Sequence, residues 1–178
     1  IKTKNSVLVG IRRLQSRDER PKIRDQPIQT RHLWQLRPII EKEAIAFGVS
    51  FVSEKEIDSI NILNASFLAM HRAVEQLSKT PEMLLIDGNR FNKYKGIAHE
   101  CIIKGDGKFL SIAAASILAK TYRDEYMEKI HQEYRVYDWN KNKGYPTKKH
   151  RRAILDHGSC VHHRQSFTLL PENQLSLF

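Results

Sequence analysis

The first regular pattern along the chain is a helical recurrence of apolar residues, which then changes to an alternation. The positions that follow the helical period are Leu36, Ile39, Ile40, Ala44 and Phe47. Pro38 falls inside this stretch and is tolerated only if the helix begins near Leu36. Residues 48–53 then alternate in the manner of a half-buried strand.

The middle of the chain predicts a capped helix, a longer helix and a buried strand. Ser53, with Glu56 three residues later, forms the capping-box pattern that opens a helix. Residues 65–77 follow the helical period, and their inward positions are Leu68, Ala69, Ala73 and Leu77. Residues 83–86 are a continuous apolar run, as in a buried strand.

The rest of the pattern completes an alternation of strands and helices. It comprises a strand at 99–103, a turn at 105–107, the strongest helix at 111–134, and a last helix capped by Thr147 and ended by Gly158. This alternation predicts an α/β domain. Before it, residues 7–11 are compatible with a short strand, whereas 12–31 are charged and broken by prolines, which favours loop or disorder.

Composition narrows the class of protein. The 178 residues are 40% hydrophobic and 28% charged, which is typical of one globular domain. We expect no membrane association, because no apolar run approaches the roughly 18 residues of a membrane span, and 7–11 are too few for a signal peptide. Cys101 and Cys160 form no disulfide framework, so we expect a cytoplasmic protein, and a monomer. The net charge of +10 favours a nucleic-acid partner, although a generic basic surface also has such a charge.

Two aspartates stand where chemistry is placed in α/β proteins. Asp87 ends the apolar run at 83–86, and strand ends are where such sheets bind ligands; the alternative is an ordinary turn aspartate before Gly88. Asp124 shares one face of the strongest helix with Lys120, near the edge of its apolar stripe. It is therefore a candidate metal ligand, or half of a surface ion pair with Lys120.

Five ordered segments together resemble the bacterial ribonuclease HII family, the type 2 ribonucleases H. The resemblance is dense from about Leu33 to Phe167. The segments are 57–63 (IDSINIL), 85–89 (LIDGN), 111–120 followed by Arg123-Asp124 (SIAAASILAK, RD), 143–148 with His150 (KGYPTK), and 163–167 (HRQSF).

The resemblance implies a ribonuclease H-like mixed sheet flanked by helices, and an endoribonuclease. Such an enzyme hydrolyses the RNA strand of RNA–DNA hybrids and cuts 5′ to ribonucleotides embedded in duplex DNA. Four carboxylates hold two Mg²⁺ or Mn²⁺ ions about 4 Å apart, one activating water and one stabilising the leaving oxygen. Here the resemblance assigns Asp87 and Asp124 to metal binding and catalysis. It assigns substrate binding to Tyr145, Asn89, Lys120, Lys143 and Lys148.

The sequence departs from the family at its beginning. The family's first strand ends in Asp-Glu-Ala-Gly-Arg-Gly, which supplies two carboxylates and senses the ribose 2′-hydroxyl. The 178 residues do not contain it. Asp18-Glu19-Arg20 is no substitute, because no apolar strand precedes it and Pro21 replaces the glycines. We therefore expect a truncated or diverged segment at 1–32, a ribonuclease H-like domain at 33–167 that lacks its first central strand, and a tail at 168–178.

Two further clusters have alternative interpretations. Six basic residues surround Tyr145, as in a nucleic-acid groove or a solvated helix face: Lys141, Lys143, Lys148, Lys149, Arg151 and Arg152. A second cluster suggests a small zinc protein built around Cys160, but it lacks a second ligand pair. Its members are Asp156, His157, Cys160, His162 and His163.

The last five residues resemble the peptide with which bacterial DNA-processing proteins dock into the sliding clamp. The matching positions are Gln174, Leu175, Leu177 and Phe178. Apolar side chains on a flexible tail fill pockets at modest affinity, although a frayed apolar C-terminus would look similar. Two hypotheses follow for the whole chain: a metal-dependent endoribonuclease, or a non-catalytic remnant that still binds nucleic acid and the clamp. The missing Asp-Glu pair separates them.

Overall fold

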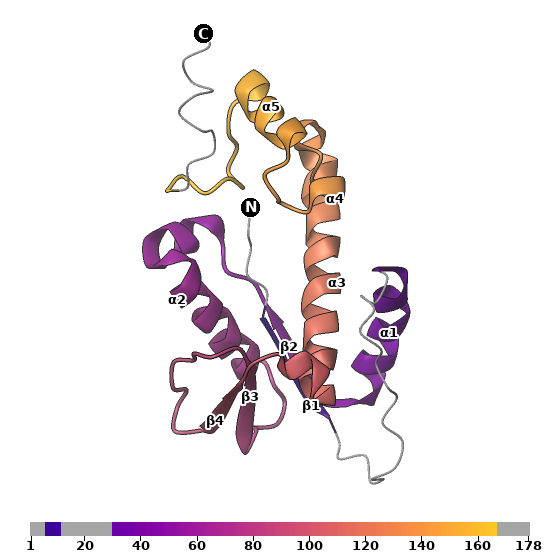
Figure 1. The fold of residues 1–178 in the computed structure, drawn as a ribbon, viewed down its shortest axis with the longest axis vertical. Coiled ribbons are helices and arrows are strands. Elements are labelled where there is room, and N and C mark those ends of the chain that lie inside the picture. The colour runs from indigo at the N-terminus through magenta and orange to yellow at the C-terminus, as the bar shows by residue number, and fades with distance from the viewer. Residues whose placement is uncertain (1–5, 12–29, 167–178) are drawn as a thin grey trace.

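A computed structural model describes residues 6–11 and 30–166 (Figure 1). The elements in chain order are β1 (Ser6–Ile11), α1 (Thr30–Glu43), β2 (Ala44–Ser50), α2 (Glu54–Glu75), β3 (Met83–Asp87), β4 (Ala98–Ile102), the 3₁₀ turn η1 (Gly105–Gly107), α3 (Leu110–Glu133), the 3₁₀ turn η2 (Arg135–Tyr137), α4 (Trp139–Asn142) and α5 (Lys148–His157). The tail at 168–178 lies outside the described residues. Among the described helices none is long and apolar enough to span a membrane.

The strands form two separate pairs. β1 runs antiparallel to β2, whereas β3 runs parallel to β4, with Met83 opposite Ala98 and Asp87 opposite Ile102. Within the described residues no strand joins one pair to the other. The predicted α/β class is confirmed, while the expected single sheet is divided into these two pairs. β3 is also not buried along its whole length, since Leu84 and Ile86 point inward and Met83 is exposed.

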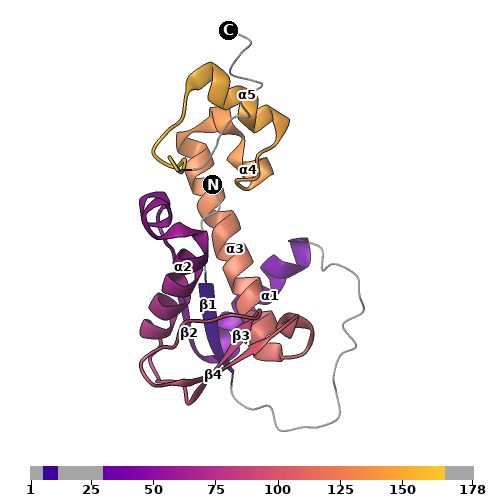
Figure 2. The ribbon, with the colours of Figure 1, turned by 60° about the vertical axis from the view of Figure 1, so that its left-hand side comes forward.

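Helix α3 is the long central helix along which the other elements are arranged (Figure 1). Its 24 residues span about 36 Å. The strands, η1 and α1 lie around its first part, and α4 and α5 lie at its far end in both views (Figures 1 and 2). The predictions of this helix and of the last one are confirmed: Thr147 caps α5 by accepting a hydrogen bond from His150 N, and Gly158 ends the helix. The elements at the two ends of α3 are therefore connected by one long helix.

Helix α1 corrects the predicted boundary. It begins at Thr30, so Pro38 lies in its interior, and Ala44 and Phe47 belong to β2 instead. The loss of one backbone hydrogen bond at Pro38 is compensated by packing on α3. Arg37 donates to Glu41 and to Glu125 at 2.8 Å each. Its guanidinium also lies 3.7 Å from the ring centre of Tyr122.

Helix α2 contains the predicted cap and an unpredicted break. Ser53 and Glu56 form the capping box. Asn61 has a left-handed φ of 66°, and its side-chain oxygen accepts hydrogen bonds from the amides of Leu63 and Asn64, so it restarts the helix. The helix then packs closely on β2: a Cβ added at Gly48 would lie 2.2 Å from a backbone oxygen of α2.

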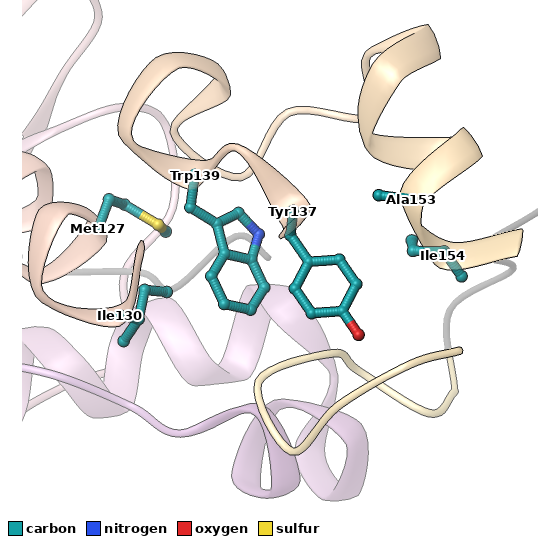
Figure 3. Packing of buried hydrophobic residues seen from close by; sticks show 6 residues of the cluster. All are labelled: Met127, Ile130, Tyr137, Trp139, Ala153 and Ile154. Atoms are coloured by element: carbon teal, nitrogen blue, oxygen red, sulfur yellow. The ribbon is translucent and has the colours of Figure 1, made fainter. Parts of the chain in front are cut away.

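An aromatic core fixes α4 and α5 to the far end of α3 (Figure 3). Its buried residues are Met127, Ile130, Tyr137, Trp139, Ala153 and Ile154. Trp139 is completely buried, and its ring centre lies 4.9 Å from that of Tyr137. The loop between α4 and α5 is thereby anchored at both of its ends.

Candidate functional site

Asp87 is held at the end of β3 by the chain that follows β4. Its Oδ1 accepts a hydrogen bond of 2.9 Å from the amide of Gly105, and the amide of Gly88 donates to Ile102 O at 3.0 Å. The residue is nevertheless exposed. The carboxylate therefore has one oxygen fixed by the backbone and remains accessible to solvent at the sheet edge where α/β proteins bind ligands.

Asp106 is a second carboxylate in the turn whose Gly105 amide is hydrogen-bonded to Asp87. It directly follows Gly105 in η1, is exposed, and accepts a hydrogen bond from Gly107 N at 3.0 Å. The turn is pressed onto α3, because a Cβ at Gly105 would lie 2.6 Å from a methyl carbon of Ile112. The sequence predicts only a turn for this segment. The sequence does contain a signal: an aspartate ends β3, and another follows shortly after β4. Because the two strands pair in parallel, their carboxyl ends lie at the same edge of the sheet.

Asp124 lies in the second half of α3. At about 1.5 Å per residue, roughly 18 Å of helix rise separates Asp124 from Ile112, which touches η1. Asp124 is buried, with 7% of its surface exposed, while Lys120 is exposed, and no ion pair between them is present within the described chain. A metal-binding role for Asp124 stays a prediction.

The residues predicted to bind substrate lie in two groups, with Lys120 of α3 between them. Asn89 is exposed just beyond Asp87, near the start of the helix. Tyr145 and Lys148 are exposed in the loop and first turn of α5 at the far end, with Lys143 half-buried beside them. Lys120 lies on the exposed side of α3 between these two groups. A ligand that touches both groups must therefore extend along the helix.

The loop that carries Tyr145 is tightly held. Lys143 and Gly144 have φ of 48° and 80°, and the amide of Gly144 donates to Asn142 Oδ1 at 2.8 Å. Asn142 is buried and also donates to Tyr137 O at 2.7 Å. Tyr145 presents 54% of its surface to solvent above this frame. An exposed aromatic ring on a fixed loop suits stacking on a nucleotide.

Two of the segments that resemble the family lie in contact: residues 57–63 and residues 163–166. Asp58 accepts hydrogen bonds from Gln165 N at 2.6 Å and from Ser166 Oγ at 2.5 Å. Desolvation acts to raise the pKa of Asp58, but these two hydrogen bonds together lower it. The end of the described chain is thus attached to the first turn of α2.

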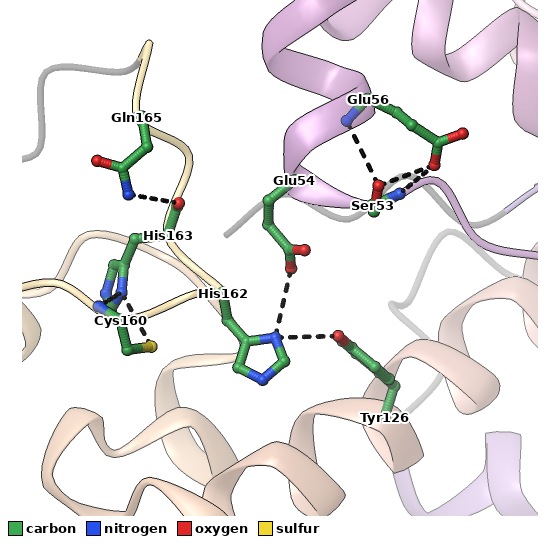
Figure 4. Close-up of polar contacts among 8 residues, drawn as sticks. All are labelled: Ser53, Glu54, Glu56, Tyr126, Cys160, His162, His163 and Gln165. Carbon is green, nitrogen blue, oxygen red and sulfur yellow. Dashed lines mark hydrogen bonds and ion pairs between the residues drawn. The ribbon is translucent and has the colours of Figure 1, made fainter.

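The histidine and cysteine cluster is a packed connection between α2, α3 and this C-terminal segment (Figure 4). His162 Nδ1 lies 3.8 Å from Glu54 and 3.3 Å from the hydroxyl of Tyr126. His163 Nδ1 accepts from the amide of Cys160 at 3.0 Å. No three histidine, cysteine or acidic side chains are arranged to hold a metal in the part of the chain that the structure describes. The zinc interpretation therefore gains no support.

His163 predicts a loss of stability in acid. Burial, and then the neighbouring His150 stacked at 5.3 Å, lower the pKa of His163 to about 4. Because the folded state disfavours the charged ring, its contribution is complete above about pH 6.5 and is lost as pH falls towards 4. We expect the free energy of unfolding to fall by roughly 3 kcal/mol over that interval from this group alone.

Urea denaturation at several pH values measures this loss. His163→Asn keeps an acceptor for the Cys160 amide and should flatten the profile between pH 6.5 and 4, whereas His157→Asn, at the exposed end of α5, should leave it unchanged. An unaltered profile in His163→Asn would show that other groups cause the acid sensitivity.

Known structures share this fold. A ribonuclease H2 from Pyrococcus horikoshii OT3 matches with a TM-score of 0.66 at 20% identity, covering 80% of this chain and 74% of that one. The ribonuclease HII in a complex with PCNA from Archaeoglobus fulgidus matches with a TM-score of 0.60 at 18% identity, covering 79% and 74%. These two likenesses show that the chain shares the fold of the archaeal ribonuclease H2 and HII structures.

Sequence comparisons identify the family. The family model for ribonuclease HII matches residues 22–170. A ribonuclease HII of Bacteroides thetaiotaomicron is 69% identical over 142 residues, which cover 80% of this chain and 71% of that protein. One of Bacteroides fragilis is 66% identical over 143 residues, with the same two coverages. The chain belongs to the ribonuclease HII family of endonucleases, which depend on divalent metal ions, and the predicted family is confirmed.

Proposed function

We propose that this chain binds RNA–DNA hybrids and duplex DNA containing single ribonucleotides, and supplies part of the site that cuts 5′ to the ribonucleotide. The observation that carries the proposal is the pairing of Asp87 with the Asp106 turn through the Gly105 amide. Fixed carboxylates at the ends of adjacent strands are what metal-assisted phosphodiester hydrolysis requires. Family membership gives the reaction class.

The residues at this site fit a hard divalent cation. Asp87 keeps Oδ2 clear of its backbone hydrogen bond, and the exposed Asp106 adds a second carboxylate. Mg²⁺ and Mn²⁺ prefer such oxygen ligands and retain several waters. When bound, the ions supply an activated water and stabilise the leaving oxygen. The chain's own part is to hold two oxygen donors on rigid strand ends.

The substrate lies along α3 in this proposal. Lys120 and Ser116 share the exposed face of the helix between the carboxylates and Tyr145. Tyr145 forms the stacking platform at one end, with Lys143 and Lys148 near the phosphates, and Asn89 lies beside the carboxylates at the other end. Phosphate contacts position the duplex and the ring reads the strand.

A second candidate function is binding without cleavage. The sequence contains no Asp-Glu-Ala-Gly-Arg-Gly segment, and the two strand pairs are not hydrogen-bonded to one another in the described chain. This polypeptide therefore has one pair of carboxylates where the family uses four. Binding of nucleic acid through α3 and the Tyr145 loop needs none of the missing groups.

Mn²⁺ binding by three matched variants tests the metal site. We expect Asp87→Asn and Asp106→Asn each to weaken binding by at least about tenfold, because a lost carboxylate removes a charged ligand. Asp124→Asn tests the predicted role of Asp124 in the same assay and should also weaken binding if that carboxylate holds the metal. Electron paramagnetic resonance of free Mn²⁺ gives the three constants. Weakening by Asp124→Asn but not by Asp106→Asn would restore the original pair of Asp87 and Asp124.

We also propose that the C-terminal tail docks into a bacterial sliding clamp. The residues concerned are Gln174, Leu175, Leu177 and Phe178, which lie outside the described residues. The Archaeoglobus fulgidus relative forms a complex with PCNA. Deleting residues 174–178 should abolish capture by immobilised clamp while leaving duplex affinity unchanged. Equal capture with and without the tail would remove the proposal.

A further inference from the structure

Arg123 connects α3 to the loop that carries Tyr145. One terminal nitrogen of its guanidinium donates a hydrogen bond to the carbonyl oxygen of Lys143, and the group lies 5.4 Å from the ring centre of Tyr145. A single side chain therefore contacts both the backbone of the loop and the exposed ring. This geometry needs the planar, forked guanidinium, because a lysine ammonium offers no second nitrogen to cover the ring.

The loop adopts a conformation that needs such support. Lys143 lies in the left-handed region at φ 48°, which a residue with a side chain seldom adopts. Its carbonyl is held by Arg123, and the next amide, of Gly144, is held by Asn142. Tyr145 N then donates to Asn142 O at 2.9 Å. An unusual backbone conformation fixed from two sides, below a ring that is more than half exposed, indicates positioning for a ligand.

We propose that Arg123 is a positioning residue for Tyr145, fixing the angle and height of the ring so that one face stacks on the nucleic-acid strand. This inference rests on the proposed binding of nucleic acid and adds a residue to that site. Its cation occupies one side of the ring and leaves the other for the substrate. The Nε of Arg123 is buried without a hydrogen-bond partner among the described groups, so the side chain is committed to the loop and not to solvent.

A double-mutant cycle on the full chain tests the proposal. Fluorescence anisotropy measures the Kd for duplex DNA that carries one ribonucleotide, with Arg123→Met, Tyr145→Ala and both together. We expect each single change to weaken binding on the order of tenfold, the scale of one lost stacking contact. The Kd of the double variant should not exceed the larger of the two single-variant Kd values, since Arg123 acts through Tyr145. Losses that multiply in the double variant would overturn the proposal and make Arg123 an independent phosphate contact.

Two controls separate positioning from lost charge and lost fold. Lys79→Met removes one exposed cation between α2 and β3, outside the basic cluster around Tyr145, and should change the Kd less than about threefold, within the effect of one surface charge. Arg123→Lys keeps the charge, and we expect it to recover only part of the affinity. If Arg123→Lys recovered the full affinity, the positive charge alone would be sufficient, and the proposed need for the forked guanidinium would be wrong.

Amide hydrogen exchange in the free protein keeps the test independent of any nucleic acid. Arg123→Met should speed exchange at Gly144 and Tyr145 while protection in the middle of α3 is retained. If Tyr145→Ala leaves duplex binding unchanged, stacking by Tyr145 fails as a proposed function, but faster loop exchange in Arg123→Met still supports the positioning contact. Unchanged exchange at both amides would overturn it whatever the binding data.

Discussion

A polypeptide of these 178 residues is expected to cut duplex DNA at a single ribonucleotide at least about 10³-fold more slowly than the Bacteroides thetaiotaomicron relative. Removing one preorganised group that stabilises transition-state charge typically costs 10² to 10³ in rate. The sequence lacks the family's Asp-Glu-Ala-Gly-Arg-Gly segment, with its two carboxylates and its glycine-rich turn. The assay is cleavage of an end-labelled duplex in Mg²⁺ or Mn²⁺, with both proteins at equal concentration.

A chimera provides the matched control. Residues 1–29 are replaced by the corresponding N-terminal segment of that relative, which is 69% identical over its aligned part. We expect cleavage to return towards the rate of the relative, and Asp87→Asn in the chimera to abolish it. Equal rates for the unmodified chain and the relative would contradict the expectation. If Asp87→Asn then abolished the activity of the unmodified chain, other residues must replace the absent carboxylates.

The elements most accurately predicted from the sequence are those whose local signals agree with their packing. The capping box at Ser53, the helix from about 111 to 134 and the cap at Thr147 each combine a cap or a strong helix propensity with an apolar face. Errors arose where tertiary contacts outweigh local preference. Pro38 predicted that the helix begins near Leu36, but α1 begins at Thr30, and the contacts of Arg37 with α3 hold the helix together across the proline.

The site shows the same division. Asp87 could be predicted as a candidate because a carboxylate at the end of an apolar strand is visible in the sequence. Asp106 was missed because its importance comes from the hydrogen bond between Asp87 and Gly105, which joins residues 18 apart in the chain. Arg123 was missed as well, since its contact with the Tyr145 loop depends on how α4 packs on α3. Spacing along one helix cannot reveal either relation.

Trp139→Ala is expected to lower the free energy of unfolding by about 3–5 kcal/mol, the usual cost of truncating a buried aromatic side chain. Trp139 is fully buried between η2, α3 and α5, where its ring packs against Tyr137, Tyr134 and His163. Removing it leaves a cavity beneath the start of α4. Urea denaturation followed by circular dichroism measures the change.

The second tryptophan of the chain supplies the control. Trp34 lies on α1 with 41% of its surface exposed, so Trp34→Ala should cost much less, about 1 kcal/mol. Trp139→Phe keeps most of the volume and should recover a large part of the loss. If Trp139→Ala lowers the free energy of unfolding no more than Trp34→Ala does, the aromatic core does not hold α4 and α5 against α3. The conformation of the Tyr145 loop, which connects those two helices, would then be determined by Arg123 and Asn142 alone.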